Sequence, residues 1–306
     1  MHIVSIGEVL WDVIGDQEYL GGAPLNFSVS SQRLGHQVVL ITAVGDDRRG
    51  ELAVSRIQQL GLPADSIRVV EGCATGAAMV STDRAGNATF VIDRPAAFDF
   101  IEIDGPALRR IQKMRPDWIY FGTLAQTTAR NEDSLHRLIS ALPEARRFYD
   151  INLREGHWNL PLVLRLSRLA SIVKLNEGEA ELLFHRFCPD KVFSVEKFCE
   201  NWSREVGAKT ICVTLGERGC ALWIEGAFRT YPGFVARVED TVGAGDAFSA
   251  ALLHGLELGW PTERTAGFAN AVGAVVASRA GATPPWTVDE CLTLADPQGS
   301  QFGAIR

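Results

Sequence analysis

The residue types best suited to chemistry lie in one short segment, residues 240–246 (DTVGAGD), which is followed by a small, apolar stretch. Because that stretch, residues 247–258, is made of good helix formers, the sequence predicts that Gly243, Ala244 and Gly245 stand at the N-terminus of a helix. Residues this small leave the backbone N–H groups open to a ligand, and the helix dipole adds roughly half a positive charge there. The segment is therefore predicted to bind an anion such as a phosphate.

Asp246 follows this glycine turn directly and falls on the first turn of the predicted helix. The helix dipole favours the ionised form of a carboxylate at that place. Such a carboxylate can accept a proton from a hydroxyl while the preceding amides stabilise the charge of a transferring phosphoryl group. The glycine pattern alone leaves one alternative open, an ordinary glycine-rich connection to a helix whose first turn is acidic.

Two other nucleotide-binding motifs with similar glycines do not occur in the sequence. A P-loop needs a lysine directly after its last glycine, and no lysine in this chain follows a glycine. The dinucleotide fingerprint G-x-G-x-x-G needs a third glycine at the position of Phe248. Neither motif explains the segment.

The composition limits the partners of the protein. A net charge of −7 over 306 residues argues against a protein built around nucleic acid, but backbone dipoles can still hold an anion locally. No apolar run approaches the ~18 residues that cross a bilayer, and the N-terminus shows no secretory signal pattern, so we expect a cytoplasmic protein with no membrane partner. The six cysteines form no C-x-x-C pair and are expected to be reduced.

The rest of the chain alternates between short apolar runs and helical patterns, which predicts a mostly parallel sheet with helices on both faces. Predicted strands cover residues 2–6, 38–44, 67–70, 118–121, 147–150, 172–175 and 210–214. Predicted helices cover residues 26–34, 51–60, 131–141 and 194–206, and another begins near residues 180–184.

One segment breaks this rhythm. Residues 77–82 and 89–92 are rich in strand formers and flank a turn sequence at residues 83–87. A hairpin there is predicted to belong to a separate small sheet, a β lid built from approximately residues 8–24 and 72–104. We expect a single domain over residues 1–306 that carries this lid.

The segment at 240–246 resembles the signature of the PfkB (ribokinase-like) family of carbohydrate kinases, and further similar landmarks occur along essentially the whole chain. They are GGAPLN at 21–26, GDD at 45–47, DINLR at 150–154, NEGE at 176–179 and TLGERG at 214–219. The resemblance implies a ribokinase-like α/β fold and the ATP-dependent phosphorylation of a primary hydroxyl on a monosaccharide.

The resemblance also implies roles at the phosphates. Asp246 is expected to be the catalytic base, and the amides of residues 243–245 to form the anion hole. Asn176 and Glu179 are similar to the N-x-x-E motif that orders Mg2+ and its waters. Oxygen ligands suit this hard cation, although an ordinary helix cap would use the same pair of residues.

The residues that the resemblance places around ATP are small or polar: Asn176, Thr214, Gly216, Gly219, Gly245 and Asn270. Glycines in the segment 214–219 let the backbone approach a nucleotide closely, although a plain β-turn would have the same composition. Asn270 matches a position that lines the adenine pocket, and its small neighbours suit either a flat ring or close helix packing.

The resemblance assigns the sugar contacts to Asp12, Gly22, Asn26, Arg94 and Arg154. Asp12, Gly22 and Asn26 match positions that hydrogen-bond the sugar, although polar groups after a buried strand are also ordinary surface groups. Arg154 suits a phosphate or a structural carboxylate, and Arg94, at the end of the predicted hairpin, suits the carboxylate of an acidic sugar.

One departure concerns a monovalent cation. Many members of the family bind K+ beside the anion hole, through an aspartate that matches Asp240 and through a loop that matches residues 280–285. Pro285 stands where that loop supplies a hydroxyl. Because of this departure, the resemblance does not by itself imply that this chain binds K+.

Within the family, residues 21–26, residues 150–154 with Trp158, and the lid sequence most resemble fructokinases. The alternatives are a kinase of 2-keto-3-deoxygluconate or of a nucleoside and, from a different class, a sugar- and nucleotide-binding regulator without catalysis. The presence of Asp246 argues against a regulator, because a sensor needs no base. A small lid sheet leaves exposed edges, so a homodimer through the lid is expected, as in many relatives.

Overall fold

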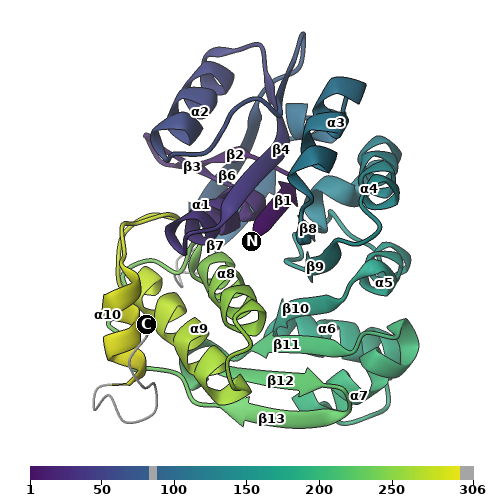
Figure 1. The fold of residues 1–306 in the computed structure, drawn as a ribbon, viewed down its shortest axis with the longest axis vertical. Helices are drawn as coiled ribbons and strands as arrows, with labels where there is room; N and C mark the ends of the chain where they lie inside the picture. Colours follow the sequence, from purple (N-terminus) through teal and green to yellow (C-terminus); the bar gives the residue numbers. More distant parts are fainter. Residues whose placement is uncertain (83–87, 297–306) are drawn as a thin grey trace. The chain divides into compact units, whose positions relative to one another are not determined.

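The computed structural model describes residues 1–82 and 88–296 (Figure 1). It contains a nine-stranded sheet in the order β13-β12-β11-β10-β9-β8-β1-β4-β5 and a four-stranded sheet in the order β3-β2-β6-β7. In the large sheet, β4 pairs in parallel with β1 and β5, and β10 with β9 and β11, whereas β12 and β13 pair antiparallel. The predicted mostly parallel α/β sheet is confirmed, and the predicted turn at residues 83–87 lies outside the described residues.

The chain divides into two compact units, and the first comprises Met1–Gln32, His36–Arg147 and Leu153–Trp158. Its strands in the large sheet are β1 (His2–Ile6), β4 (Gln37–Gly45), β5 (Ile67–Val70) and β8 (Trp118–Gly122), and its helices are α1 (Ala23–Arg33), α2 (Arg48–Gln59), α3 (Gly105–Met114) and α4 (Ala129–Ala141). In Figure 1, α3 and α4 lie on one side of β1 and β4, and α2 lies on the other. Every residue of β8 is buried, because helices cover the strand and its sequence, WIYFG, is almost wholly apolar.

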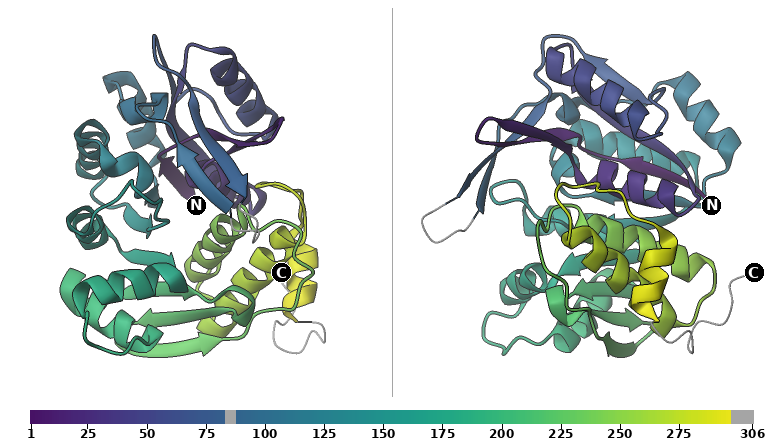
Figure 2. Two further views of the ribbon diagram at one scale, coloured as in Figure 1. Left: turned by 180° about the vertical axis from the view of Figure 1, so that it is seen from behind. Right: turned by 90° about the vertical axis from the view of Figure 1, so that its left-hand side faces the viewer.

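The four-stranded sheet also belongs to the first unit. It consists of β2 (Leu10–Ile14), β3 (Gln17–Gly21), β6 (Gly76–Thr82) and β7 (Ala88–Ile92), which the right-hand view of Figure 2 shows in purple and blue as a group of extended strands. The β6–β7 hairpin is confirmed, and a small second sheet fits the predicted lid. The sequence did not indicate β2 and β3 separately, because most of β3 is exposed and has no buried face to impose a pattern.

The second unit comprises Arg33–Gly35, Phe148–Asn152 and the chain from Asn159 onward. Its strands are the end of β9 (Arg146–Asp150), β10 (Ile172–Asn176), β11 (Thr210–Thr214), β12 (Cys220–Ile224) and β13 (Ala227–Tyr231), and its helices are α5 (Leu160–Leu169), α6 (Glu177–Phe187), α7 (Val195–Val206), α8 (Ala244–Glu257), α9 (Thr262–Ala277) and α10 (Val288–Ala295). Helices α8 and α9 pack directly on each other. No helix in the described residues has both the length and the apolar character required to cross a bilayer.

Polar side chains begin most of the helices. Asp47 accepts a hydrogen bond from the N–H of Gly50 at the start of α2, and Asn159 accepts one from Leu162 at the start of α5. Helix α8 differs, because its cap is Gly243, which has no side chain to accept such a bond. The N–H groups of the first turn of α8 therefore have no side-chain cap of their own.

Candidate functional site

The predicted anion segment forms the N-terminus of α8. Gly243 has a φ of 78°, and a β-carbon added there would lie 1.9 Å from the carbonyl oxygen of Ala282, so no larger residue fits. Ala244 and Gly245 are the first two residues of the helix. Asp246 follows on the first turn and is 8% exposed. The structure thus places the predicted base and the three predicted anion-hole residues on one helix turn.

Asp240 connects this turn to the loop at residues 280–285. Its Oδ1 accepts a hydrogen bond from the N–H of Val242 at 2.9 Å, and its Oδ2 accepts one from the N–H of Gly281 at 3.0 Å. The carboxylate therefore fixes the glycine turn against the loop on which Pro285 lies.

A buried ion pair lies against the same turn. Nζ of Lys174, in β10, lies 3.1 and 3.0 Å from the two carboxylate oxygens of Asp150, and the Ser249 hydroxyl of α8 donates to Asp150 at 3.0 Å. The side chains of Lys174 and Asp150 are 8% and 0% exposed. A β-carbon added at Gly245 would lie 3.2 Å from Nζ of Lys174, so the ammonium group lies next to the α-carbon of Gly245.

Electrostatics keep this ammonium group charged. Burial acts to lower the pKa of Lys174, but the carboxylates of Asp150, Asp246 and Glu179 oppose it, and the pKa is raised above its ordinary value. Lys174 therefore carries a full positive charge at neutral pH.

The predicted nucleotide residues gather around one pocket of about 420 Å³ in the second unit. Its lining includes every residue that the sequence assigned to ATP: Asn176, Thr214, Gly216, Gly219, Gly245 and Asn270. The side-chain amide of Asn270 donates to the carbonyl oxygen of Pro232 at 2.9 Å, so it also holds the segment that forms another wall. The pocket has the size and the mixed polar and apolar lining that small-molecule sites require.

Asn176 and Glu179 form a reciprocal helix cap at the start of α6. Oδ1 of Asn176 accepts from the N–H of Glu179 at 2.9 Å, and Oε2 of Glu179 accepts from the N–H of Asn176 at 2.8 Å. Each oxygen can accept a further bond, so these contacts are compatible with the water-mediated Mg2+ role that the sequence assigned to the pair.

Three of the predicted sugar residues lie on neighbouring elements of the first unit. Asp12 is on β2, and a β-carbon added at Gly21 would lie 2.8 Å from its Oδ2, so the carboxylate lies beside the glycine turn. Gly22 has a φ of 115° and leads into α1, where its carbonyl oxygen accepts from the N–H of Asn26 at 3.0 Å. Asn26 is 3% exposed. The turn thus brings Asp12, Gly22 and Asn26 together.

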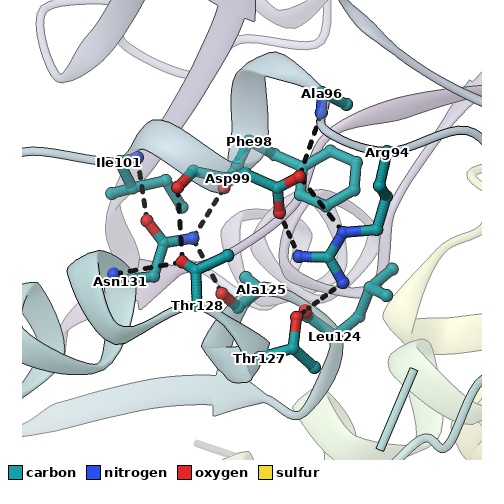
Figure 3. A network of polar contacts seen from close by, with 10 residues as sticks. All are labelled: Arg94, Ala96, Phe98, Asp99, Ile101, Leu124, Ala125, Thr127, Thr128 and Asn131. Carbon is teal, nitrogen blue, oxygen red and sulfur yellow. Dashed lines mark hydrogen bonds and ion pairs between the residues drawn. The ribbon is translucent and has the colours of Figure 1, made fainter.

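Arg94 lies in a polar network of the first unit (Figure 3). Its guanidinium forms a two-pronged ion pair with Asp99, with Nε 3.1 Å from Oδ2, and also donates to the carbonyl oxygen of Leu124 at 3.4 Å. Asp99 also accepts from the N–H of Ala96 at 2.9 Å, and the amide of Asn131 bonds three backbone groups nearby. The guanidinium of Arg94 is thus bound by two protein groups, the carboxylate of Asp99 and the carbonyl oxygen of Leu124.

Nη1 of Arg154 donates to the carbonyl oxygen of its neighbour Leu153 at 3.1 Å. Arg154 belongs to the short segment Leu153–Trp158 of the first unit. Its predicted contact with a phosphate stays a prediction.

Comparison with known proteins agrees with this arrangement. A family model described as pfkB family carbohydrate kinase matches residues 2–289. The chain belongs to this family. It is 28% identical to probable fructokinase-3 of Arabidopsis thaliana over 97% of this chain and 92% of that protein. It is also 28% identical to the fructokinase of Solanum tuberosum, over 95% of each chain.

The fold of the pfkB kinase likewise matches a solved structure. The fructokinase with bound ATP from Xylella fastidiosa superposes with a TM-score of 0.84 at 22% identity, covering 98% of this chain and 99% of that one. This match confirms the predicted ribokinase-like fold, and the family model confirms the predicted sugar kinase.

Sequence reasoning missed two parts of the candidate site. Lys174 passed unnoticed inside a predicted strand, although a lysine within the apolar run at 172–175 was a signal of a buried charge. The segment at 232–239 was also missed, and it contributes Phe234, Ala236 and Val238 to the pocket that Asn176 and Asn270 line.

Proposed function

We propose that this pfkB kinase transfers the terminal phosphoryl group of ATP to a primary hydroxyl of a neutral monosaccharide, and that the sugar is fructose. The observation that carries the proposal is the position of Asp246 on an uncapped helix turn that lines a nucleotide-sized pocket. The similarity to proteins named fructokinases supports the choice of sugar.

In the proposed mechanism, the carboxylate of Asp246 accepts the proton of the acceptor hydroxyl as that oxygen attacks the phosphorus atom. The N–H groups at residues 243–245 stabilise the negative charge on the transferring group, because they are preorganised at the positive end of α8. The bond to the leaving ADP breaks as the new bond to the sugar oxygen forms. Catalysis then consists of positioning and charge stabilisation.

Asn176 and Glu179 are the residues that we assign to Mg2+. Their side-chain oxygens lie together in the cap of α6, and Asn176 lines the nucleotide pocket. When bound, the ion would neutralise the phosphate oxygens. We assign no role to K+, because Pro285 has no hydroxyl to offer where the matching loop of the family supplies one.

Asp12, Gly22 and Asn26 are the proposed sugar contacts, since a half-buried carboxylate and a buried amide beside a glycine turn suit the reading of hydroxyls. The engagement of Arg94 by Asp99 supports a neutral sugar. The carboxylate of 2-keto-3-deoxygluconate would have to compete with Asp99 for the same guanidinium.

A coupled assay for ADP release tests the proposal, with fructose, ribose, tagatose, 2-keto-3-deoxygluconate and adenosine offered in turn. We expect the highest kcat/KM with fructose. A higher value with the acidic sugar or the nucleoside would overturn the choice of sugar, and binding of sugar and ATP without turnover would favour a regulator.

A further inference from the structure

The ion pair between Lys174 and Asp150 lies where folding alone would not place a cation. The N-terminus of a helix is stabilised by nearby negative charge and destabilised by nearby positive charge. Nζ of Lys174 nevertheless lies against Gly245, the second residue of α8. A positive charge at this place raises the potential of the glycine turn instead of neutralising it.

Stability does not account for the pair either. Taking two charges out of water is costly, and well-packed apolar residues of similar volume are often as good or better in a protein interior. Both side chains are nonetheless almost completely buried, with Nζ 3.0 Å from the nearer carboxylate oxygen of Asp150. The arrangement becomes favourable when an anion binds at the glycine turn.

We propose that Lys174 is a positioning residue that supplies a fixed positive charge behind the anion hole, so that the N–H groups of α8 hold the terminal phosphate of a nucleoside triphosphate. The inference rests on the proposed function, because it assigns that phosphate to the glycine turn. Asp150 holds the ammonium in place, and the Ser249 hydroxyl, which has one proton to donate, lies 3.0 Å from Oδ2 of Asp150 and 2.9 Å from the carbonyl oxygen of Gly245.

Removal of the ammonium would change the charge that an arriving phosphate meets. Lys174 interacts electrostatically with the carboxylates of Asp150, Asp246 and Glu179. Without the ammonium, these negative groups would face the phosphate with only the helix dipole to offset them. The terminal phosphate should then lose its contribution to binding, whereas the rest of the nucleotide should keep its own.

Calorimetric titration with ADP and with the β,γ-imido analogue of ATP tests this directly. In Lys174→Met, which keeps the length of the side chain, we expect the affinity for the analogue to fall roughly tenfold and that for ADP to change less than about twofold. Lys209→Met is the matched control, because it removes a lysine charge from an exposed position of the same unit that does not line the pocket. It should retain the wild-type ratio of the two affinities.

The double variant Lys174→Met with Asp150→Asn covers the case in which the single variant fails to fold, because it removes the fully buried charge of Asp150 together with its partner. It should melt cooperatively and show the same loss of preference for the analogue. A wild-type ratio of affinities in whichever of these variants folds would overturn the inference.

Turnover separates this inference from the function proposed above. If the wild type phosphorylates a sugar, kcat of Lys174→Met should fall by roughly 10- to 10²-fold with an unchanged KM for the sugar. If no sugar is phosphorylated but the affinity ratio still falls in Lys174→Met, the role of Lys174 stands and the proposed function fails. If the wild type binds neither nucleotide, both are overturned.

Discussion

At the residue scale, the proposed chemistry depends on the carboxylate of Asp246. Asp246→Asn keeps the shape of the side chain and removes the proton acceptor, so kcat should fall by roughly 10²- to 10⁴-fold. Binding of ATP and sugar, measured by calorimetry, should persist because the pocket and the glycine turn are unchanged. A wild-type kcat in this variant would show that the proton is taken elsewhere.

Arg94 is the second residue for which the structure predicts the effect of a substitution. Its partner Asp99 is 4% exposed, and Arg94→Ala would leave that carboxylate without its cation. We expect the free energy of unfolding in urea to fall by about 3–5 kcal/mol. The KM for fructose, measured below the melting temperature, should change little, because the guanidinium faces protein groups in the network of Figure 3.

The opposite result has a clear meaning. If Arg94→Ala retained its stability but raised the KM for a sugar acid steeply, the guanidinium would be a substrate contact and the acidic sugar would be preferred. Asp99→Asn is the matched variant, since it breaks the same ion pair while leaving the arginine available to a ligand.

At the scale of elements, the first turn of α8 requires its glycines for two different reasons. Gly243→Ala would place a methyl group 1.9 Å from the carbonyl oxygen of Ala282, at a φ of 78° that alanine rarely adopts. The free energy of unfolding should fall by more than about 2 kcal/mol, and the loop at 280–285 must move. Nucleotide binding, measured on the folded fraction, should weaken with it.

Gly245→Ala is the matched comparison within the same turn. The added methyl group would meet only the end of the Lys174 side chain, at 3.2 Å, which can shift by a few tenths of an ångström. Its cost in stability should be the smaller of the two. Equal losses of stability in the two variants would show that the contacts of the added methyl groups do not determine the cost.

Two strands were placed to the residue. Strand β11 has an apolar, buried centre, and three of the four residues of β5 are β-branched, although none of them is buried. The hairpin of β2 and β3 was not predicted, since its exposed face carries no pattern. The glycine turn of α8 was predicted because three small residues precede a run of good helix formers.

The partners within the site could not be predicted in the same way. That Lys174 pairs with Asp150 depends on the parallel register of β9 and β10, which places the two residues side by side although 24 positions separate them. The engagement of Arg94 by Asp99 likewise depends on how the segment after β7 turns back. Register and turn geometry are properties of the folded chain, and one sequence does not display them.

At the scale of the whole molecule, His254 should make stability depend on pH. The ring is half-buried beside Trp260 and Phe268, with ring centroids 5.4 and 6.1 Å away, and burial lowers its pKa from 6.5 to about 4. As the pH falls, His254 is therefore protonated near pH 6.5 in the unfolded chain but only near pH 4 in the folded protein. Stability is full above pH 6.5 and declines as the pH falls through this window.

Urea unfolding at a series of pH values checks this expectation. His254→Phe keeps an aromatic ring in the same place but cannot be protonated, so its stability should decline less than that of the wild type between about pH 6.5 and pH 4. Parallel curves for the two proteins would show that the histidine titrates alike in the folded and unfolded states.

The surface of the four-stranded sheet leads to the last prediction, that the protein is a homodimer through its lid. Met79 of β6 and Val91 of β7 pair directly across the strands and are 47% and 52% exposed, which is unusual for apolar side chains on a sheet face. Strands β3 and β7 are the edges of this sheet, and pairing with a second copy would cover them.

Light scattering at micromolar concentration should give twice the mass of the chain. Met79→Glu with Val91→Glu should give the monomer, because burying two carboxylates in each partner costs more than an interface of this kind supplies. Val192→Glu, at a valine of the second unit that is 79% exposed, is the control and should stay dimeric. A monomeric wild type would remove the lid from consideration as an interface and leave the proposed kinase mechanism unaffected.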